Sequence, residues 1–306
     1  MLEGPFPPAT ADVQLARASS LTHQHLLAVV NTRLAAIAPT KRVITICDVG
    51  CGNGVFLSYL ASGLRLLWPR NEFHFYGIDV SDSGVQAEGF FASTIRTLAA
   101  AHPEVDWTSR LHLIRSTERW PFDDGAIDVI TSNQVLEHVR DHAHFMAESY
   151  RVLATGGVGT HLFPLRHYIW EGHLHIPLVH KIHQHDLVRK YIKAMSYIGL
   201  GVYKGHRDQF GHSRDFFAEE HADYMTFMTN YKSAREMLAY CKAAGLRSTY
   251  AHTWEFYEAL LRKRLGLKPR HGYKERGFMF SLLSYLFCRY LSSVTLTTEK
   301  HQLYSR

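Results

Sequence analysis

Short apolar runs, rich in β-branched residues, alternate along the first half of the chain with longer stretches whose apolar residues have helical spacing. A run such as Val43–Val49 is typical of a strand that is buried on both faces of a sheet. Strands of this kind are expected at residues 43–49, 73–78, 111–115, 127–131 and 158–163. Helices are expected up to Trp68, at 81–101 with Ser81 or Asp82 as N-cap, and at 141–153, closing on Gly156-Gly157. This alternation predicts parallel βαβ units.

The two ends of the chain extend the pattern. A helix is expected from an Asp12 N-cap to Ile37, where Pro39 follows. After residue 230 we expect a helix at 231–244 stopped by Gly245, a strand at 246–251, an apolar helix at 278–290 and a strand at 294–298. The helix at 278–290 is apolar on most sides, which favours burial on the sheet. The fold class is therefore α/β, with a mostly parallel seven-stranded sheet and helices on both faces.

Residues 164–230 interrupt this alternation. The segment is rich in His, Tyr and Arg, and Val188, Tyr191, Ile192 and Met195 have helical spacing within it. We therefore expect a long, largely helical insertion after the fifth strand. The chain divides into a proline-containing disordered leader (1–11), an N-terminal helix and ligand-binding core (12–163), the insertion (164–230) and the C-terminal part of the same core (231–306).

Composition narrows the class of protein only modestly. The chain of 306 residues is 46% hydrophobic and 20% charged, which is ordinary for a globular protein, and its formal net charge is +6. No dense basic tract is present, so a nucleic-acid partner is not expected. The four cysteines form no CxxC pair, and we find neither a signal peptide nor an apolar run of about 18 residues. These features predict a cytoplasmic protein.

The most informative motif is Asp48-Val-Gly50-Cys51-Gly52-Asn-Gly54, between the first predicted strand and helix. Glycines there let the backbone turn sharply and approach a ligand at the carboxyl end of the strand. Asp79 ends the next strand, where a carboxylate accepts both hydroxyls of a ribose. The spacing is GxGxG rather than GxGxxG, and Asp48 would repel a pyrophosphate. The pattern favours a nucleoside with an ammonium group and no phosphate, such as S-adenosylmethionine, over NAD.

Five motifs between residues 43 and 163 resemble those of class I S-adenosylmethionine-dependent methyltransferases. They are Asp48–Gly54, Gly77-Ile-Asp79, Trp120-Pro-Phe122 followed by Ile127-Asp-Val129, Ser132–Val139, and Arg151–Gly157. The small-molecule branch related to ubiquinone and menaquinone methyltransferases is the most similar, and the insertion and C-terminal pattern resemble enzymes of bacterial glycan and natural-product pathways. The resemblance implies a Rossmann-like fold, S-adenosylmethionine as cofactor and S-adenosylhomocysteine as product.

Carried over by position, the resemblance implies a set of cofactor contacts. The backbone of the glycine loop would lie along the methionine part of the cofactor, and Asp79 would bind the ribose. Val80 would pack on the adenine ring, and residues 116–118 would contact its amino edge. Asn133 and Gln134 would lie near the sulfonium. The family commonly has Asp where this chain has Ser116, a weaker acceptor. The expected cofactor residues are Asp48, Gly50, Cys51, Gly52, Gly54, Asp79, Val80, Ser116, Thr117, Glu118, Asn133 and Gln134.

A hydroxyl acceptor needs a general base, and histidine suits this role near neutral pH. His138 follows Glu137 just after the fourth strand. Ubiquinone O-methyltransferases have Glu-x-x-Glu-His there as a metal site, but this chain has Gln134 for the first Glu, so we expect no metal. The alternative role for His138 is to hold its loop by hydrogen bonds.

The insertion offers a second set of candidates, Glu171, His173 and His175. If this segment is extended, the two histidines lie on one face, beside a carboxylate that would orient one of them as a base. With a third ligand the same groups would bind zinc. His161, in the fifth strand, points either into the packing of the sheet or into the mouth of the site.

We therefore expect a methyltransferase that acts on a small-molecule hydroxyl, with a sugar, natural product or lipid-linked sugar as the first candidate acceptor. The alternatives are N- or C-methylation of a small metabolite and a non-catalytic, S-adenosylmethionine-binding regulatory protein. Basic residues 262–276 precede the apolar helix 278–290, so contact with an anionic membrane is the alternative to burial of that helix.

Overall fold

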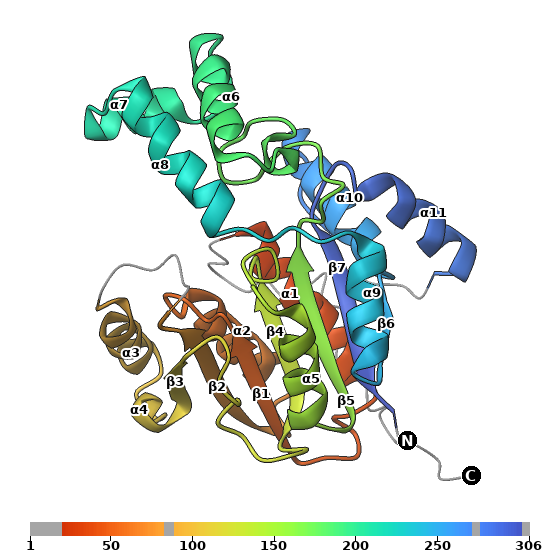
Figure 1. Ribbon diagram of the computed structural model, residues 1–306. Helices are drawn as coiled ribbons and strands as arrows, with labels where there is room; N and C mark the ends of the chain where they lie inside the picture. Colours follow the sequence, from red (N-terminus) through yellow and green to blue (C-terminus); the bar gives the residue numbers. More distant parts are fainter. Residues whose placement is uncertain (1–19, 83–88, 271–275, 302–306) are drawn as a thin grey trace.

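The computed structural model describes residues 20–82, 89–270 and 276–301, and its centre is a seven-stranded sheet (Figure 1). The strand order is β3-β2-β1-β4-β5-β7-β6. The first five strands are parallel, and β7 is antiparallel to both β5 and β6. The strands are β1 (Val43–Val49), β2 (Glu72–Val80), β3 (Leu111–Ile114), β4 (Ile127–Asn133), β5 (Leu153–Phe163), β6 (Leu246–Thr249) and β7 (Val294–Lys300). The predicted α/β fold class is confirmed.

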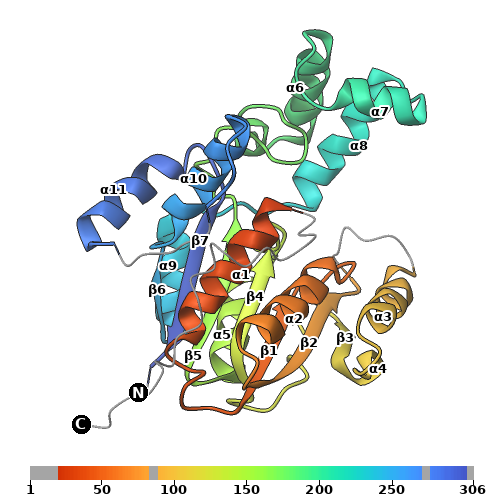
Figure 2. The same cartoon turned by 180° about the vertical axis from the view of Figure 1, so that it is seen from behind.

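Helices cover both faces of this sheet. The ribbon shows α5 and α9 on one face, and α1 and α2 on the face seen from behind (Figures 1 and 2). Helix α10 packs against α1 and α11. The helices outside the insertion are α1 (Leu21–Leu34), α2 (Val55–Leu67), α3 (Phe90–Ala101), α4 (Trp107–Arg110), α5 (His142–Val152), α9 (Ala234–Ala243), α10 (Thr253–Arg264) and α11 (Phe278–Cys288). No helix in the described ranges is both long and apolar enough to cross a membrane.

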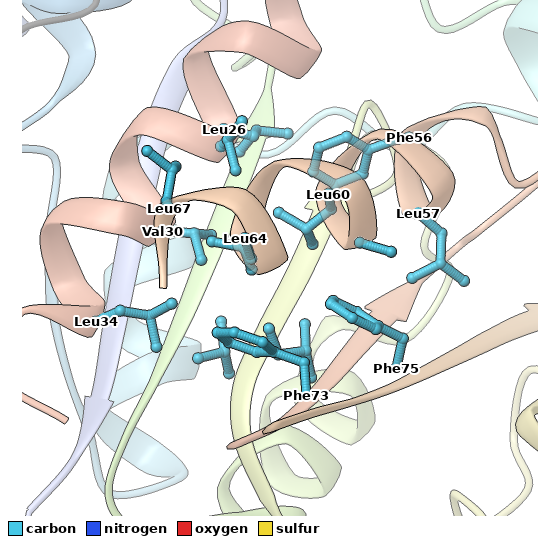
Figure 3. Packing of buried hydrophobic residues seen from close by; sticks show 14 of the residues in the cluster. Leu26, Val30, Leu34, Phe56, Leu57, Leu60, Leu64, Leu67, Phe73 and Phe75 are labelled. Atoms are coloured by element: carbon cyan, nitrogen blue, oxygen red, sulfur yellow. The ribbon is translucent and has the colours of Figure 1, made fainter. Parts of the chain in front are cut away.

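The largest core cluster lies where α1 and α2 pack on β1 and β2 (Figure 3). Leu26, Val30 and Leu34 recur every four residues and so lie on one face of α1. Leu57, Leu60 and Leu64, spaced by three and four residues, share one face of α2, and both rows are almost fully buried. This packing fixes the first βα unit, and with it the turn that joins β1 to α2.

The insertion has a core of its own. It contains η1 (Val179–Lys181), α6 (His185–Tyr197), α7 (Tyr203–Phe210) and α8 (Arg214–Phe227). Val188 and Ile192 of α6 face Phe217 and Ala218 of α8 in a separate buried cluster. The insertion stands beyond the carboxyl end of β5, so it lies at the end of the sheet where the parallel strands finish (Figures 1 and 2).

Two predicted helix ends are wrong, and a third, the Asp12 N-cap, lies outside the described residues. Helix α1 begins at Leu21 with Ser20 as N-cap, whereas Asp12 and the leader 1–11 lie outside the described residues. Helix α3 begins at Phe90 after Gly89, so neither Ser81 nor Asp82 caps it. Helix α5 ends at Val152 because β5 starts at Leu153, which places Gly156-Gly157 inside the strand.

The C-terminal part holds two further differences. Helix α10 was not predicted, because its apolar residues form no clear stripe in the sequence. Helix α11 was predicted in the right place, but its expected burial is wrong. Most of its large apolar side chains are exposed, and it lies beside α10 rather than on the sheet (Figure 1).

Candidate functional site

A cavity of about 530 Å³ lies at the carboxyl ends of β1, β2 and β4. Its position follows from the topology, because open parallel sheets bind ligands beyond their carboxyl edge where the strand order reverses. Ten of the twelve predicted cofactor residues line it, namely Asp48, Gly50, Cys51, Gly52, Asp79, Val80, Ser116, Thr117, Asn133 and Gln134. Gly54 and Glu118 lie outside the lining.

The glycine loop forms the floor of the cavity. The backbone N–H groups of Gly50 and Cys51 both donate to the carbonyl of Ile78, at 2.8 and 3.1 Å, which ties the loop to the end of β2. Gly50 has φ +74, and a Cβ there would collide with the side chain of Val135. Only glycine therefore fits between the two strand ends.

Asp79 is held at the edge of this floor by the backbone. Its two oxygens accept from the N–H groups of Gly52 (2.6 Å) and Val80 (2.8 Å). Burial raises the pKa of Asp79, and the two hydrogen bonds act in the opposite direction. A fixed carboxylate that lines the cavity in this way can accept hydrogen bonds from a diol.

Asp48 is more deeply buried and has less support. It accepts one hydrogen bond from the hydroxyl of Thr131, at 2.9 Å. Burial raises the pKa of Asp48 to about 8, and the nearby charge of Asp79 acts in the same direction. The pair of carboxylates at one end of the cavity therefore favours a cationic ligand group there.

Asp82 also lines the cavity, although the sequence analysis considered it only as a helix cap. Asp82 accepts from the backbone N–H of Ser116 (2.9 Å) and from its hydroxyl (3.1 Å). Glu118 instead accepts from the backbone N–H of Arg115, at 2.9 Å, away from the cavity. An acidic residue shortly after the second predicted strand is the signal in the sequence that could have pointed to this position.

The N-terminus of α1 contributes a wall that sequence reasoning also missed. His23 lines the cavity and its ring centre lies 5.2 Å from that of Phe56 in α2. Asn133 donates to the hydroxyl of Thr22 at 3.3 Å, and Gln134 takes φ +56 to enter the cavity after β4. No sequence signal links α1 to β4, because the contact depends on tertiary packing.

Beyond Gln134 the cavity meets the insertion at His138. This histidine lines the cavity, and its Nδ1 lies 2.8 Å from the carbonyl oxygen of Met228. Its ring centre is 5.2 Å from that of His173 and 6.0 Å from that of Tyr224. The structure therefore brings together His138 and His173, two candidates that are 35 residues apart in the sequence.

His173 is paired with Glu171. Its Nδ1 lies 2.6 Å from one carboxylate oxygen of Glu171, and the hydroxyl of Tyr231 donates to the same oxygen at 2.8 Å. The other oxygen of Glu171 accepts from the N–H of Leu174 at 2.6 Å. Burial disfavours the charged form of Glu171, but these hydrogen bonds outweigh it and lower its pKa to about 2. Burial by itself would lower the pKa of His173, but the pairing with Glu171 outweighs burial, so the pKa of His173 is raised.

Glu137 is the third member of this group. It is fully buried, and neither side-chain oxygen has a hydrogen-bond partner on another described residue. Burial raises the pKa of Glu137 to about 8. One ligand-type atom of Glu137, His138 and His173 each lies within 4.8 Å of the other two. These groups can share a proton, and their donor set also suits a divalent cation.

Two expectations about histidines need correction or completion. Residues 171–176 form a turn rather than an extended segment, since the N–H of His175 donates to the carbonyl of Glu171 at 3.0 Å. His175 has φ +54, and the extended segment that would place it on one face with His173 is absent. His161 is buried in the sheet, where it bonds Ser132 at 2.8 Å and burial lowers its pKa to about 3. It belongs to the packing.

Comparison with known proteins adds independent information. A family model described as a methyltransferase domain matches residues 22–251. A protein of Mycolicibacterium smegmatis named as a probable S-adenosylmethionine-dependent methyltransferase is 30% identical over 132 residues, covering 42% of this chain and 40% of that protein. Tocopherol O-methyltransferase of Arabidopsis thaliana is 33% identical over 117 residues, covering 38% of this chain and 29% of the relative. The chain thus matches less than half the length of these relatives.

Among solved structures, an S-adenosylmethionine-dependent methyltransferase from Mesorhizobium loti is similar with a TM-score of 0.48 and 14% sequence identity. The match covers 87% of this chain and 95% of that structure.

Proposed function

The chain belongs to the class I S-adenosylmethionine-dependent methyltransferases, and we propose that it methylates a hydroxyl group of a small molecule with His173 as general base. The cofactor, S-adenosylmethionine, supplies a methyl group on a positively charged sulfur. The remaining steps belong to the protein, which must hold the cofactor, place the acceptor in line, exclude water and remove a proton.

The residues around the cavity fit this cofactor. The glycine loop presents backbone rather than side chains to the ligand, and Asp79 stands fixed where the ribose hydroxyls would need an acceptor. Asp48 supplies negative charge toward an ammonium group, and Asp82 with Ser116 offers polar atoms to the adenine edge. We assign these contacts as the cofactor site.

The Glu171–His173 pair carries the proposal for the base. A hydrogen bond from Nδ1 of His173 to Glu171 leaves Nε2 of the same ring to accept a proton. Glu171 then stabilises the imidazolium that forms. His138, which lines the cavity, and Tyr224 flank the ring of His173 at 5.2 and 5.3 Å, so the pair lies next to a residue of the cavity lining.

The nature of the acceptor rests on similarity alone. The Arabidopsis relative is named as an O-methyltransferase, which supports oxygen as the methylated atom. The resemblance of the insertion to glycan and natural-product methyltransferases supports a sugar, a glycosylated compound or a lipid-linked sugar. We retain the cytoplasm as the proposed location.

The test compares the variants Glu171→Gln and His173→Ala, with the exposed His183→Ala as matched control. Release of S-adenosylhomocysteine is measured with fractionated small-molecule extracts as acceptors. We expect His173→Ala to lose at least 100-fold in rate, and Glu171→Gln to lose rate and shift the acidic limb of the pH profile to lower pH. Wild-type rates in both variants would refute the base and favour N- or C-methylation.

A second experiment on the wild-type protein tests whether Glu137, His138 and His173 bind a metal ion that turnover requires. Under the proposal, prolonged dialysis against EDTA leaves turnover unchanged, because the base needs no cation. A loss that Mg²⁺ or Zn²⁺ restores would replace the histidine base with a metal site.

A further inference from the structure

Helix α11 exposes its apolar side chains and buries its polar ones. Its buried side chains are Ser284, Tyr285 and Cys288, which face the protein. Phe278 is 77% exposed and Leu283 61% exposed. The exposed apolar residues of this face are Phe278, Met279, Phe280, Leu282, Leu283, Leu286, Phe287 and Tyr290. An exposed apolar area of this size on one helix marks an interaction surface.

Arginine side chains contact both ends of this face. The guanidinium of Arg276 lies 4.5 Å from the ring centre of Phe280, and that of Arg289 lies 4.9 Å from the ring centre of Tyr290. The neighbouring α10 ends in Arg262, Lys263 and Arg264. Glu255 and Glu258 of α10 pair with Arg276, at 3.0 and 3.9 Å. From residue 259 to 298 the sequence holds eight Arg or Lys residues and one acidic residue.

An apolar helix face with basic residues around it matches the chemistry of an anionic membrane surface. At 11 residues α11 is too short to span a bilayer and would lie in its interface. A second copy of the chain is a poorer partner, because a two-fold contact through α11 would bring the same arginines and lysines together. We propose that α11, with Arg289 and the basic end of α10, docks the protein on anionic lipid.

This surface is connected to the site already described. The carbonyl of Tyr290, just after α11, accepts from the N–H of Ile169 at 3.0 Å, two residues before Glu171. Gln134, in the cavity lining, donates to the hydroxyl of Ser293 at 3.2 Å. Docking would therefore hold the cavity close to the bilayer. If the proposed function is right, the acceptor would be an amphiphile that resides in the membrane, but lipid binding itself does not depend on that function.

The experiment measures sedimentation of the full chain with vesicles of phosphatidylcholine alone or with 30% phosphatidylglycerol. We expect at least tenfold stronger binding to the anionic vesicles, weakened by salt. Leu283→Glu should weaken the affinity for anionic vesicles at least tenfold. Leu66→Glu is the matched control, because Leu66 of α2 is also 61% exposed but lies away from α11, and it should bind like the wild type.

Circular dichroism and S-adenosylhomocysteine affinity verify that both variants are folded, so loss of lipid binding is separable from loss of the cofactor site. Equal binding of Leu283→Glu and wild type would overturn the proposal. A second result would also overturn it: the wild type does not bind anionic vesicles but forms a dimer in light scattering, and Leu283→Glu dissociates this dimer. The apolar face of α11 would then bind a second copy of the chain. Retained lipid binding in a catalytically silent protein would leave this proposal standing and count against the proposed function.

Discussion

Asp48 and Asp79 lie close together at the glycine loop, but the protein holds them differently. Both oxygens of Asp79 accept backbone N–H groups, which fixes the orientation of the carboxylate before any ligand arrives. Asp48 has one hydroxyl donor and a pKa of about 8, so its charge depends on what binds beside it. Asp79 therefore presents a carboxylate of fixed orientation, whereas the charge of Asp48 responds to the charge of the ligand.

Replacing Asp79 with alanine should weaken binding of S-adenosylhomocysteine by tenfold or more. The change removes the acceptor for the ribose hydroxyls and leaves the N–H groups of Gly52 and Val80 without their partner, at about 1–3 kcal/mol for each unpaired group. Isothermal titration calorimetry measures the affinity, with the exposed Asp123→Ala as control. Unchanged affinity would refute the role of Asp79.

Cofactor affinity should also depend on pH through Asp48. An ammonium group beside Asp48 favours its charged form and so lowers its pKa on binding. Between this lowered value and about 8, binding releases a proton, so affinity should rise with pH and level off near pH 8. Calorimetry with S-adenosylhomocysteine from pH 6 to 8.5 measures the slope. A slope that persists in Asp48→Asn would assign it to another group.

At the scale of elements, sequence patterns predict the strands and most helices but not which neighbours they meet. The strand β1 has the predicted bounds, Val43–Val49, because a short run rich in β-branched residues favours a strand. Helix α11 was located from composition, yet composition does not reveal that Ser284 and Cys288 face inward. The Glu171–His173 pair is visible in the sequence because the residues are two apart. Its proximity to His138 is not, because it depends on how the insertion folds back.

Helix α9 offers a test at this scale. Ser233 and Glu236 form a reciprocal capping box, in which each side chain accepts a hydrogen bond from the backbone of the other. Ser233→Ala should lower the free energy of unfolding by about 1 kcal/mol. Urea denaturation measures this, and Ser93→Ala on the exposed face of α3 should change it by less than about 0.5 kcal/mol. Equal effects would show that the cap contributes nothing specific.

At the scale of the whole molecule, the insertion has its own core but is clamped to the sheet beside the cavity. The N–H of Asn230 donates to the carbonyl of Glu137 at 2.6 Å, and its side chain donates to the carbonyl of Val139 at 2.9 Å. At the other end of the insertion, the N–H of Arg166 donates to the carbonyl of Lys232 at 2.9 Å. The two ends of the insertion are therefore joined to each other, and the end at Asn230 meets the loop that follows β4. A ligand that orders this loop should stabilise both parts.

A thermal-shift experiment tests this coupling. At a concentration 100 times its dissociation constant, S-adenosylhomocysteine should stabilise the folded protein by about 2.7 kcal/mol, which raises Tm by several degrees. NAD should give no shift, because a pyrophosphate would lie against the carboxylate of Asp79 and would leave Asp48 without a cationic partner. If the insertion is coupled to the cavity, the wild type unfolds in one transition that moves as a whole. Two transitions, of which only one moves with ligand, would show that the insertion unfolds independently and that its contacts with Glu137 and Val139 transmit nothing.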